Sequence, residues 1–75
     1  MYKLITEKIV VEDITTNTYG IEYTKDGVSC AKINDISLDK AKVEGLANTL
    51  NENNLDPNQF FDVVEDILND PDFEG

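Results

Sequence analysis

The sequence predicts an α+β protein in which a three-stranded antiparallel meander is followed by an antiparallel two-helix hairpin packed on one face of the sheet. Three observations support this fold. Residues 2–34 are rich in β-branched side chains that tend to alternate with polar ones. Asp26-Gly27 interrupts them with a tight-turn dipeptide. Residues 37–68 instead repeat apolar side chains with a helical period and carry helix-capping residues.

The first strand is expected at Tyr2–Val11, a stretch without Gly or Pro. Its aliphatic side chains fall on both parities, as at Ile9 and Val10, so a simple one-sided strand does not account for them. Two explanations are open. A β-bulge near Glu7-Lys8 would reconcile the two phases, or a partner would cover the second face.

A turn is expected at Glu12–Asn17, which contains Asp, Thr and Asn, and a second strand at Thr18–Thr24. Gly20 within that strand indicates that another backbone or a ring approaches closely. The Asp26-Gly27 dipeptide predicts a type I′ turn leading into a third strand at Val28–Asn34. Counted outward from that turn, the pairs are Lys25 with Val28, Tyr23 with Cys30 and Ile21 with Lys32. Opposite Tyr23, Cys30 is expected to be a small core residue rather than a reactive thiol.

The first helix is expected after Ser37 as its N-cap, with Asp39 in the positively polarised first turn. Its apolar stripe is Val43, Leu46, Ala47 and Leu50. Gly45 lies away from that stripe. The run 51–54, which contains three Asn residues, ends the helix because Asn tolerates the left-handed cap conformation.

The second helix is expected to begin with Asp56 as N-cap and Pro57 at the first helical position. Gln59 would complete a capping box, and Leu55 would pack against Phe60 as a hydrophobic staple. The predicted apolar face is Phe60, Val63, Val64, Ile67 and Leu68. Asn69-Asp70-Pro71 stops the helix.

A chain of 75 residues is expected to form one thin-cored domain at residues 1–70, with a mobile tail at 71–75. No apolar run reaches the roughly 18 residues of a membrane span, and Met1 is not followed by a secretory leader. The single Cys cannot form an intrachain disulfide. These features predict a cytoplasmic protein that does not contact membranes.

The net charge is −10, and it is unevenly distributed along the chain. Residues 1–42 hold six Lys and seven acidic residues, whereas residues 43–75 hold nine acidic residues and no Lys. Asp62, Glu65 and Asp66 share one face of the second predicted helix, and Asp70 follows them. This acidic face is either a solvated surface that keeps the protein soluble or a docking surface for a basic partner.

Several kinds of chemistry lose their usual residues. Without His, the chain has no side chain that ordinarily titrates near neutral pH, and no imidazole to activate a nucleophile. One Cys and no His do not make a zinc site, and residues 51–62 depart from a calcium-binding EF-hand loop at Asp56, where Gly is needed. We therefore expect no enzymatic activity, no cofactor and no metal. The negative charge also disfavours direct nucleic-acid binding.

Phe73 lies beyond the predicted end of the second helix. It either folds back onto the helices or serves as a free hydrophobic handle for a partner.

Three segments resemble a family of small uncharacterised proteins from clostridia and related Gram-positive bacteria, labelled as a domain of unknown function. They are Thr18–Ile21, Asp35–Asp39 and Leu55–Leu68, the last containing the sequence Asp-Val-Val-Glu-Asp. The family pattern has a His near Phe60 that this chain lacks. The resemblance implies an intact single domain in a bacterial cytosol and brings no known activity.

The functional expectation is a non-enzymatic intracellular module that works by binding an unknown protein partner. A homodimer is one arrangement that fits, because the predicted sheet has two open edges and a strand with aliphatics on both faces. The alternative is an acidic decoy, whose carboxylates imitate the phosphates of a nucleic acid and block a basic nucleic-acid-binding protein.

Overall fold

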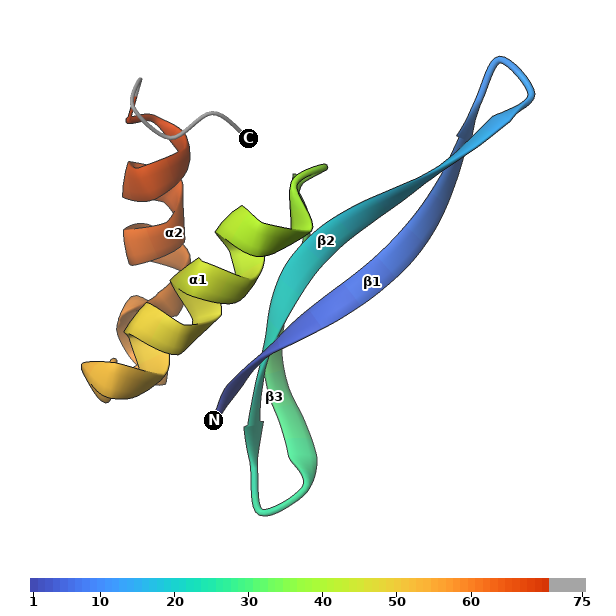
Figure 1. Ribbon diagram of the computed structural model, residues 1–75. Helices are drawn as coiled ribbons and strands as arrows, with labels where there is room; N and C mark the ends of the chain where they lie inside the picture. Colours follow the sequence, from blue (N-terminus) through green and yellow to red (C-terminus); the bar gives the residue numbers. More distant parts are fainter. Residues whose placement is uncertain (71–75) are drawn as a thin grey trace.

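A computed structural model of the protein describes residues 1–70. The tail expected at 71–75, and Phe73 within it, lie outside the described residues. The elements run in the order β1 (Tyr2–Val11), β2 (Ile14–Lys25), β3 (Val28–Ser37), α1 (Lys40–Glu52), η1 (Pro57–Gln59) and α2 (Phe60–Leu68) (Figure 1). The strands form one antiparallel sheet in the order β1-β2-β3. The predicted meander followed by two helices is confirmed.

β1 and β2 form a long hairpin with an uninterrupted register. Pairing runs from Tyr2 opposite Tyr23 to Val11 opposite Ile14 without a bulge. A β-bulge near Glu7-Lys8, one of the two explanations for the mixed parity, is therefore absent, and the aliphatic residues of β1 lie on both faces of the sheet.

The turn between β1 and β2 is shorter than expected. It consists of Glu12 and Asp13, with φ angles of 51° and 66°, as in a type I′ turn. The expected turn at Glu12–Asn17 is wrong beyond its first two residues. Ile14 and the β-branched Thr15 and Thr16 continue the hairpin as strand residues.

The turn between β2 and β3 is the predicted one. Asp26 and Gly27 have φ angles of 54° and 81°, and Lys25 pairs with Val28. One residue further on, the register shifts, so that Cys30 is an extra residue in β3. The structure pairs Thr24 with Ser29, Tyr23 with Ala31 and Ile21 with Ile33. The predicted pairs Tyr23–Cys30 and Ile21–Lys32 are wrong, and Cys30 is exposed rather than in the core.

A second irregularity bends β3 beneath Gly20. Between the pairs Ile21–Ile33 and Tyr19–Ser37, three residues of β3 lie opposite Gly20 alone. A Cβ atom at Gly20 would lie 2.2 Å from the carbonyl oxygen of Ile33. The close backbone approach predicted from this glycine is thus confirmed.

Polar contacts hold this bend. The Thr18 hydroxyl, which is fully buried, donates a hydrogen bond to Asp35. Asp35 has a φ of 53°, which an Asp tolerates better than most residues. Ser37 beyond the bend still pairs with Tyr19, and β3 therefore extends three residues past its expected end at Asn34.

α1 begins at a different cap from the one predicted. Asp39, not Ser37, is the N-cap, and its carboxylate accepts hydrogen bonds from the amides of Ala41 and Lys42. Ser37 remains part of β3, and its hydroxyl accepts a hydrogen bond from the Asp39 amide. The predicted apolar stripe Val43, Leu46, Ala47 and Leu50 is buried. Asn54, with a φ of 48°, follows the helix end as expected.

The second helical segment starts with a 3₁₀ turn. The Asp56 carboxylate accepts a hydrogen bond from the Asn58 amide, and Pro57 occupies the first position, as predicted. Gln59 makes no side-chain capping hydrogen bond, so the expected capping box does not form. α2 follows with Phe60 and Val64 fully buried, as its apolar face predicted. Leu68, expected on that face, is instead exposed.

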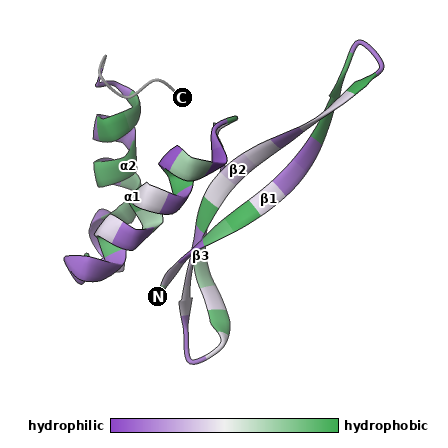
Figure 2. Ribbon diagram, in the orientation of Figure 1, coloured by the Kyte–Doolittle hydropathy of each residue, from purple (hydrophilic) through white to green (hydrophobic). Residues whose placement is uncertain are grey.

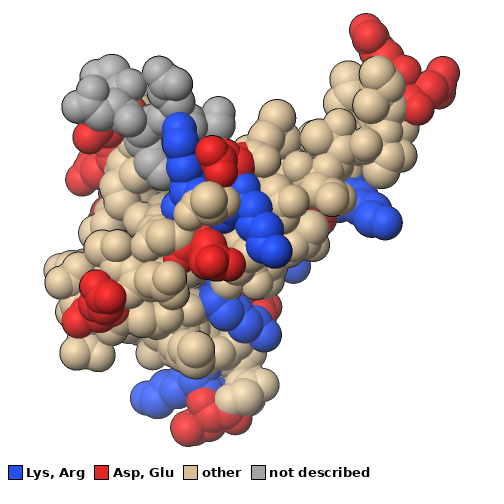
Figure 3. Space-filling view, viewed as in Figure 1, with Lys and Arg blue, Asp and Glu red and all other residues tan. Residues whose placement is uncertain are grey.

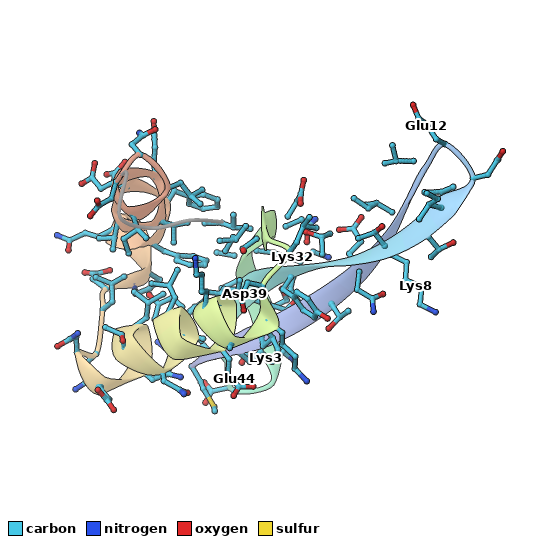
Figure 4. The ribbon with its side chains drawn as sticks, turned by 45° about the horizontal axis from the view of Figure 1, so that its top comes forward. Lys3, Lys8, Glu12, Lys32, Asp39 and Glu44 are labelled. Atoms are coloured by element: carbon cyan, nitrogen blue, oxygen red, sulfur yellow. The ribbon has the colours of Figure 1, made fainter. Side chains whose placement is uncertain are left out.

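The core lies between the sheet and the helices. α1 contacts all three strands, and α2 lies on the side of α1 away from the β1–β2 hairpin in the view of Figure 1. The two helices cross steeply in both Figure 1 and Figure 4. The buried apolar residues are Tyr2, Ile21, Ile36, Val43, Leu46, Ala47, Leu50, Phe60 and Val64.

The close approach at Gly20 yields a stability prediction. Replacing Gly20 with Ala places a methyl group against the backbone of Ile33, which cannot yield without moving β3. We expect Gly20→Ala to lower the free energy of unfolding by about 3 kcal/mol, measured by urea denaturation.

Gly45 provides the matched control, because a Cβ atom there meets nothing within 4 Å. Gly45→Ala should raise the free energy of unfolding by about 1 kcal/mol, through helix propensity alone. Equal effects of the two substitutions would contradict the role assigned to Gly20.

Candidate interaction surfaces

The outer part of the β1–β2 hairpin stands apart from the rest of the sheet. The last residue of β3, Ser37, pairs with Tyr19, so residues 8–17 form a two-stranded ribbon. We call residues 8–17 the arm. Figure 1 shows the arm projecting away from both helices. It therefore lacks both the third strand and the helical layer that cover the base of the hairpin.

The arm exposes aliphatic side chains. Val11 and Ile14 pair across the strands beside the turn and are 58% and 64% exposed. Val10 is also exposed, and Ile9 is half-buried on the same face as Val11. Figure 2 shows hydrophobic residues on both strands near the end of the arm. The arm thus carries an apolar surface at the point furthest from the core.

Sequence reasoning missed the arm because it assigned Glu12–Asn17 to a turn. Ile14 was then not counted as a strand residue, and its pairing with Val11 could not be foreseen. The signal was present in the aliphatic residues on both parities of β1. The second explanation, a face that a partner covers, stays a prediction.

The outer edge of β1 has free backbone groups. Met1 and Thr24 exchange backbone hydrogen bonds, so odd-numbered residues of β1 bond to β2 and even-numbered ones point outward. At Tyr2 this edge is occupied by the side chain of Asn51. Further along, within the part of the chain that the structure describes, the outward amides have no hydrogen-bond acceptor. They belong to Leu4, Thr6, Lys8 and Val10.

Tyr2 joins the sheet to the helical half. Its amide donates to Asn51 Oδ1 and its carbonyl accepts from Asn51 Nδ2, both at 2.7 Å. Its hydroxyl donates to the carbonyl of Leu55 at 2.9 Å. Its ring lies 4.8 Å from that of Tyr23 and 4.9 Å from that of Phe60, centroid to centroid. One residue therefore contacts β2, the end of α1, the interhelical loop and α2.

A hollow of about 380 Å³ borders this joint, between Tyr2, Tyr23 and residues 54–57. Two of the polar side chains that line it, Asn51 and Asp56, form hydrogen bonds within the fold. Asn51 bonds the Tyr2 backbone, and the Asp56 carboxylate, which lines the hollow, caps the turn at Asn58. The hollow therefore lies at a joint between structural elements.

The environment of Tyr2 raises the pKa of its hydroxyl. The main cause is burial, which disfavours the phenolate, and the nearby Tyr23 and Asp56 add to the effect. On the outer face of the sheet, the pKa of the Glu22 carboxylate is instead lowered. The Ser29 hydroxyl and the Lys3 ammonium hydrogen-bond to Glu22, and they hold its pKa below the usual value.

The predicted acidic face is present on α2. Asp62, Glu65 and Asp66 are all exposed, and Asp70 follows just after the helix end. The spacing of one helical turn brings the first three together. Phe61 and Leu68 are exposed beside them, Phe61 at 55%, so the face is bordered by apolar side chains. Phe73, the predicted hydrophobic handle, lies outside the described residues.

The lysines lie nearer the centre of the molecule than the acidic residues at the tip of the arm do. Lys3 and Lys32 flank Glu22 across the three strands, with Lys3 Nζ 3.2 Å from the Glu22 carboxylate. In the view of Figure 3, acidic side chains occupy the end of the arm and lysines gather nearer the centre. Figure 4 places Glu12 at the arm tip and Lys3 at the opposite end of β1.

Two statements hold for residues 1–70. No group of three or more Cys, Asp or Glu side chains in this range is placed to hold a metal ion. Neither helix in this range is long and apolar enough to cross a membrane.

The Tyr2 joint yields a pH prediction. Because the folded state raises the pKa of Tyr2, its protonated hydroxyl contributes stability that is complete below pH ~10 and is lost as the pH rises through the raised value. Tyr2→Phe should cost about 1 kcal/mol near neutral pH, through the lost hydrogen bond to Leu55.

The cost of Tyr2→Phe should then shrink between pH 9 and about 11, because the variant has no ionisation to suppress at this position. Urea denaturation of both proteins across this range measures the difference, to which titratable groups far from Tyr2 contribute equally in the two proteins. A cost that stays constant with pH would contradict the assignment.

The fold and its surfaces can be compared with known proteins. Among curated proteins and solved structures, no match to the chain was found. A family model does match, over residues 1–70, which include all three strands and both helices. The resemblance to a domain of unknown function is thereby confirmed. The chain belongs to DUF6514, a family of unknown function.

Proposed function

We propose that this protein is a non-enzymatic protein-interaction module of the cytoplasm, and that the arm is its principal contact surface. The observation that carries the proposal is the exposure of Val11 and Ile14 at the end of a two-stranded ribbon. A lone two-stranded hairpin is at best marginally stable in water. A bound partner would supply the contacts that the rest of the chain does not give it.

The composition of the arm supports a protein partner. Its exposed valines and isoleucine offer apolar area, and contiguous apolar area on a small protein marks an interaction site. Lys8, Glu12 and Asp13 give the arm a net charge of only −1, in contrast to the strongly acidic helical half. An apolar and nearly neutral contact surface is therefore available on an otherwise anionic molecule.

The remaining features favour binding over catalysis. They also favour a reducing compartment. The chain has no His, and Asn51 and Asp56, which line the hollow at Tyr2, are engaged in the fold. Cys30 is a single exposed thiol without a partner in the chain for a disulfide.

The two hairpin turns give a matched test of the proposal. Ile14 and Val28 each follow a two-residue turn and are 64% and 63% exposed, but only Ile14 belongs to the arm. A benzophenone photocrosslinker placed at Ile14 in cells that express the chain should give discrete adducts several-fold stronger than one placed at Val28. Adducts of equal yield at both positions would show that exposure alone determines the contact.

The second candidate is an acidic decoy for a basic nucleic-acid-binding protein. One observation favours it: Glu65 and Asp66 lie in the last turns of α2, where the helix dipole disfavours negative charge, and the last turn holds no basic residue. Together with Asp62 they present carboxylates that a phosphate-binding groove would accept. Glu65 and Asp66 cost stability where they stand, which a purely solubilising role does not require.

The decoy is tested by removing charge without changing shape. Glu65→Gln with Asp66→Asn should raise the free energy of unfolding by about 0.5 kcal/mol and abolish retention of basic cytosolic proteins on the immobilised chain at low salt. The control, Glu44→Gln with Glu52→Gln, removes the same charge from exposed sites on α1 and should leave retention unchanged. Equal retention by all three proteins would eliminate the decoy.

A further inference from the structure

We propose that the partner of the arm is a second copy of this chain, joined through the outer edge of β1 as an antiparallel strand pair. The two sheets would then form one six-stranded sheet with the order β3-β2-β1-β1-β2-β3. This inference rests on the proposed function of the arm as a contact surface. It adds the identity of the partner and the edge that binds it.

The edge of β1 is suited to adding a strand. From Leu4 to Val10 its outward amides are free, and the strand is regular, without a bulge or a Pro. Natural proteins interrupt or cover such edges, because they template pairing with another chain. Asn51 covers the edge at Tyr2. This cover ends at Tyr2, so the backbone edge of β1 from Leu4 to Val10 is unpaired.

Twofold symmetry agrees with the apolar pattern of the strand. An axis perpendicular to the sheet makes the two β1 strands antiparallel and keeps equivalent side chains on the same face. Ile5, Ile9 and Val11 share the face opposite Tyr2 and the helices. In the pair, these residues of both copies meet across the seam at cross-strand spacing. The aliphatic residues on the second face of β1 then become part of one continuous apolar surface.

Charge complementarity selects the second copy and the antiparallel direction. Glu12 and Asp13 lie at the tip of the arm, and Lys3 lies at the opposite end of β1 (Figure 4). Antiparallel pairing brings the tip of each copy towards Lys3 of the other, whereas parallel pairing would bring the two acidic tips together. The helical half, with nine acidic residues and no Lys in residues 43–75, repels its own copy and leaves the sheet edge as the surface for self-association.

The test blocks one edge at a time with proline. The amide of Thr6 points outward from β1, and that of Thr15 points outward from β2, on the other edge of the arm. Both side chains are exposed, and neither amide bonds within the β1–β2 ladder. Thr6→Pro and Thr15→Pro therefore leave the hairpin paired while each removes one outward donor.

Size-exclusion chromatography with light scattering at micromolar concentrations should give twice the chain mass for the wild type and for Thr15→Pro. Thr6→Pro should weaken the dimer by about thirtyfold or more, since two backbone hydrogen bonds are lost per dimer. A dimer that survives Thr6→Pro, or that is lost only in Thr15→Pro, would overturn the assignment of the edge.

Hydrogen exchange keeps the test independent of folding defects. The amides of Thr6, Lys8 and Val10 should exchange more slowly as the wild-type concentration rises, while amides inside the β1–β2 ladder should not change. A wild type that is monomeric at every concentration overturns self-association. If the crosslinker at Ile14 then yields adducts with a different protein, the arm remains an interaction surface and only its partner was misassigned.

Discussion

The fold depends on the attachment of the first strand to the helical half through Tyr2. The side-chain amide of Asn51 hydrogen-bonds the Tyr2 backbone as a neighbouring strand would, with one donor and one acceptor. The hydroxyl of Tyr2 fixes the interhelical loop at Leu55, and its ring packs on Phe60 at the start of α2. A small domain has a thin core, so a side chain that contacts four elements sets how they are placed. The same contact covers the base of the β1 edge and so defines where the free edge begins.

The second constraint is the bend at Gly20, and it brings two distant motifs together. Thr18 from β2 and Asp35 from β3 are joined by a part-buried hydrogen bond beside the glycine. The bend lets Ile36 reach the core before the chain turns into α1 at Asp39. The segments Thr18–Ile21 and Asp35–Asp39, which first indicated the family, thus form one structural unit. Their residues fix the geometry of the sheet and the start of α1.

The sequence predicted the elements well and their pairing less well, for physical reasons. Helix caps and apolar stripes are local signals, and Asp56, Pro57 and the buried residues of α1 were identified from them. Strand register depends on bulges, which insert residues without a clear local signature. For that reason Cys30, which was expected in the core, lies at the surface. The acidic face of α2 was also predictable, because it lies on one helix. The arm was not, since its exposure follows from where β3 ends.

That exposure follows from a mismatch in length. β2 has 12 residues and, as an extended strand, spans about 40 Å, whereas the 13 residues of α1 span about 20 Å. One helix laid on the sheet can therefore cover only part of the hairpin, and the Tyr2 joint fixes that part at the base. The uncovered end carries Val11 and Ile14, which a strand intended for solvent on both faces would not need. α1 packs against the base of the sheet and α2 lies beyond it, so within residues 1–70 the end of the arm is left exposed.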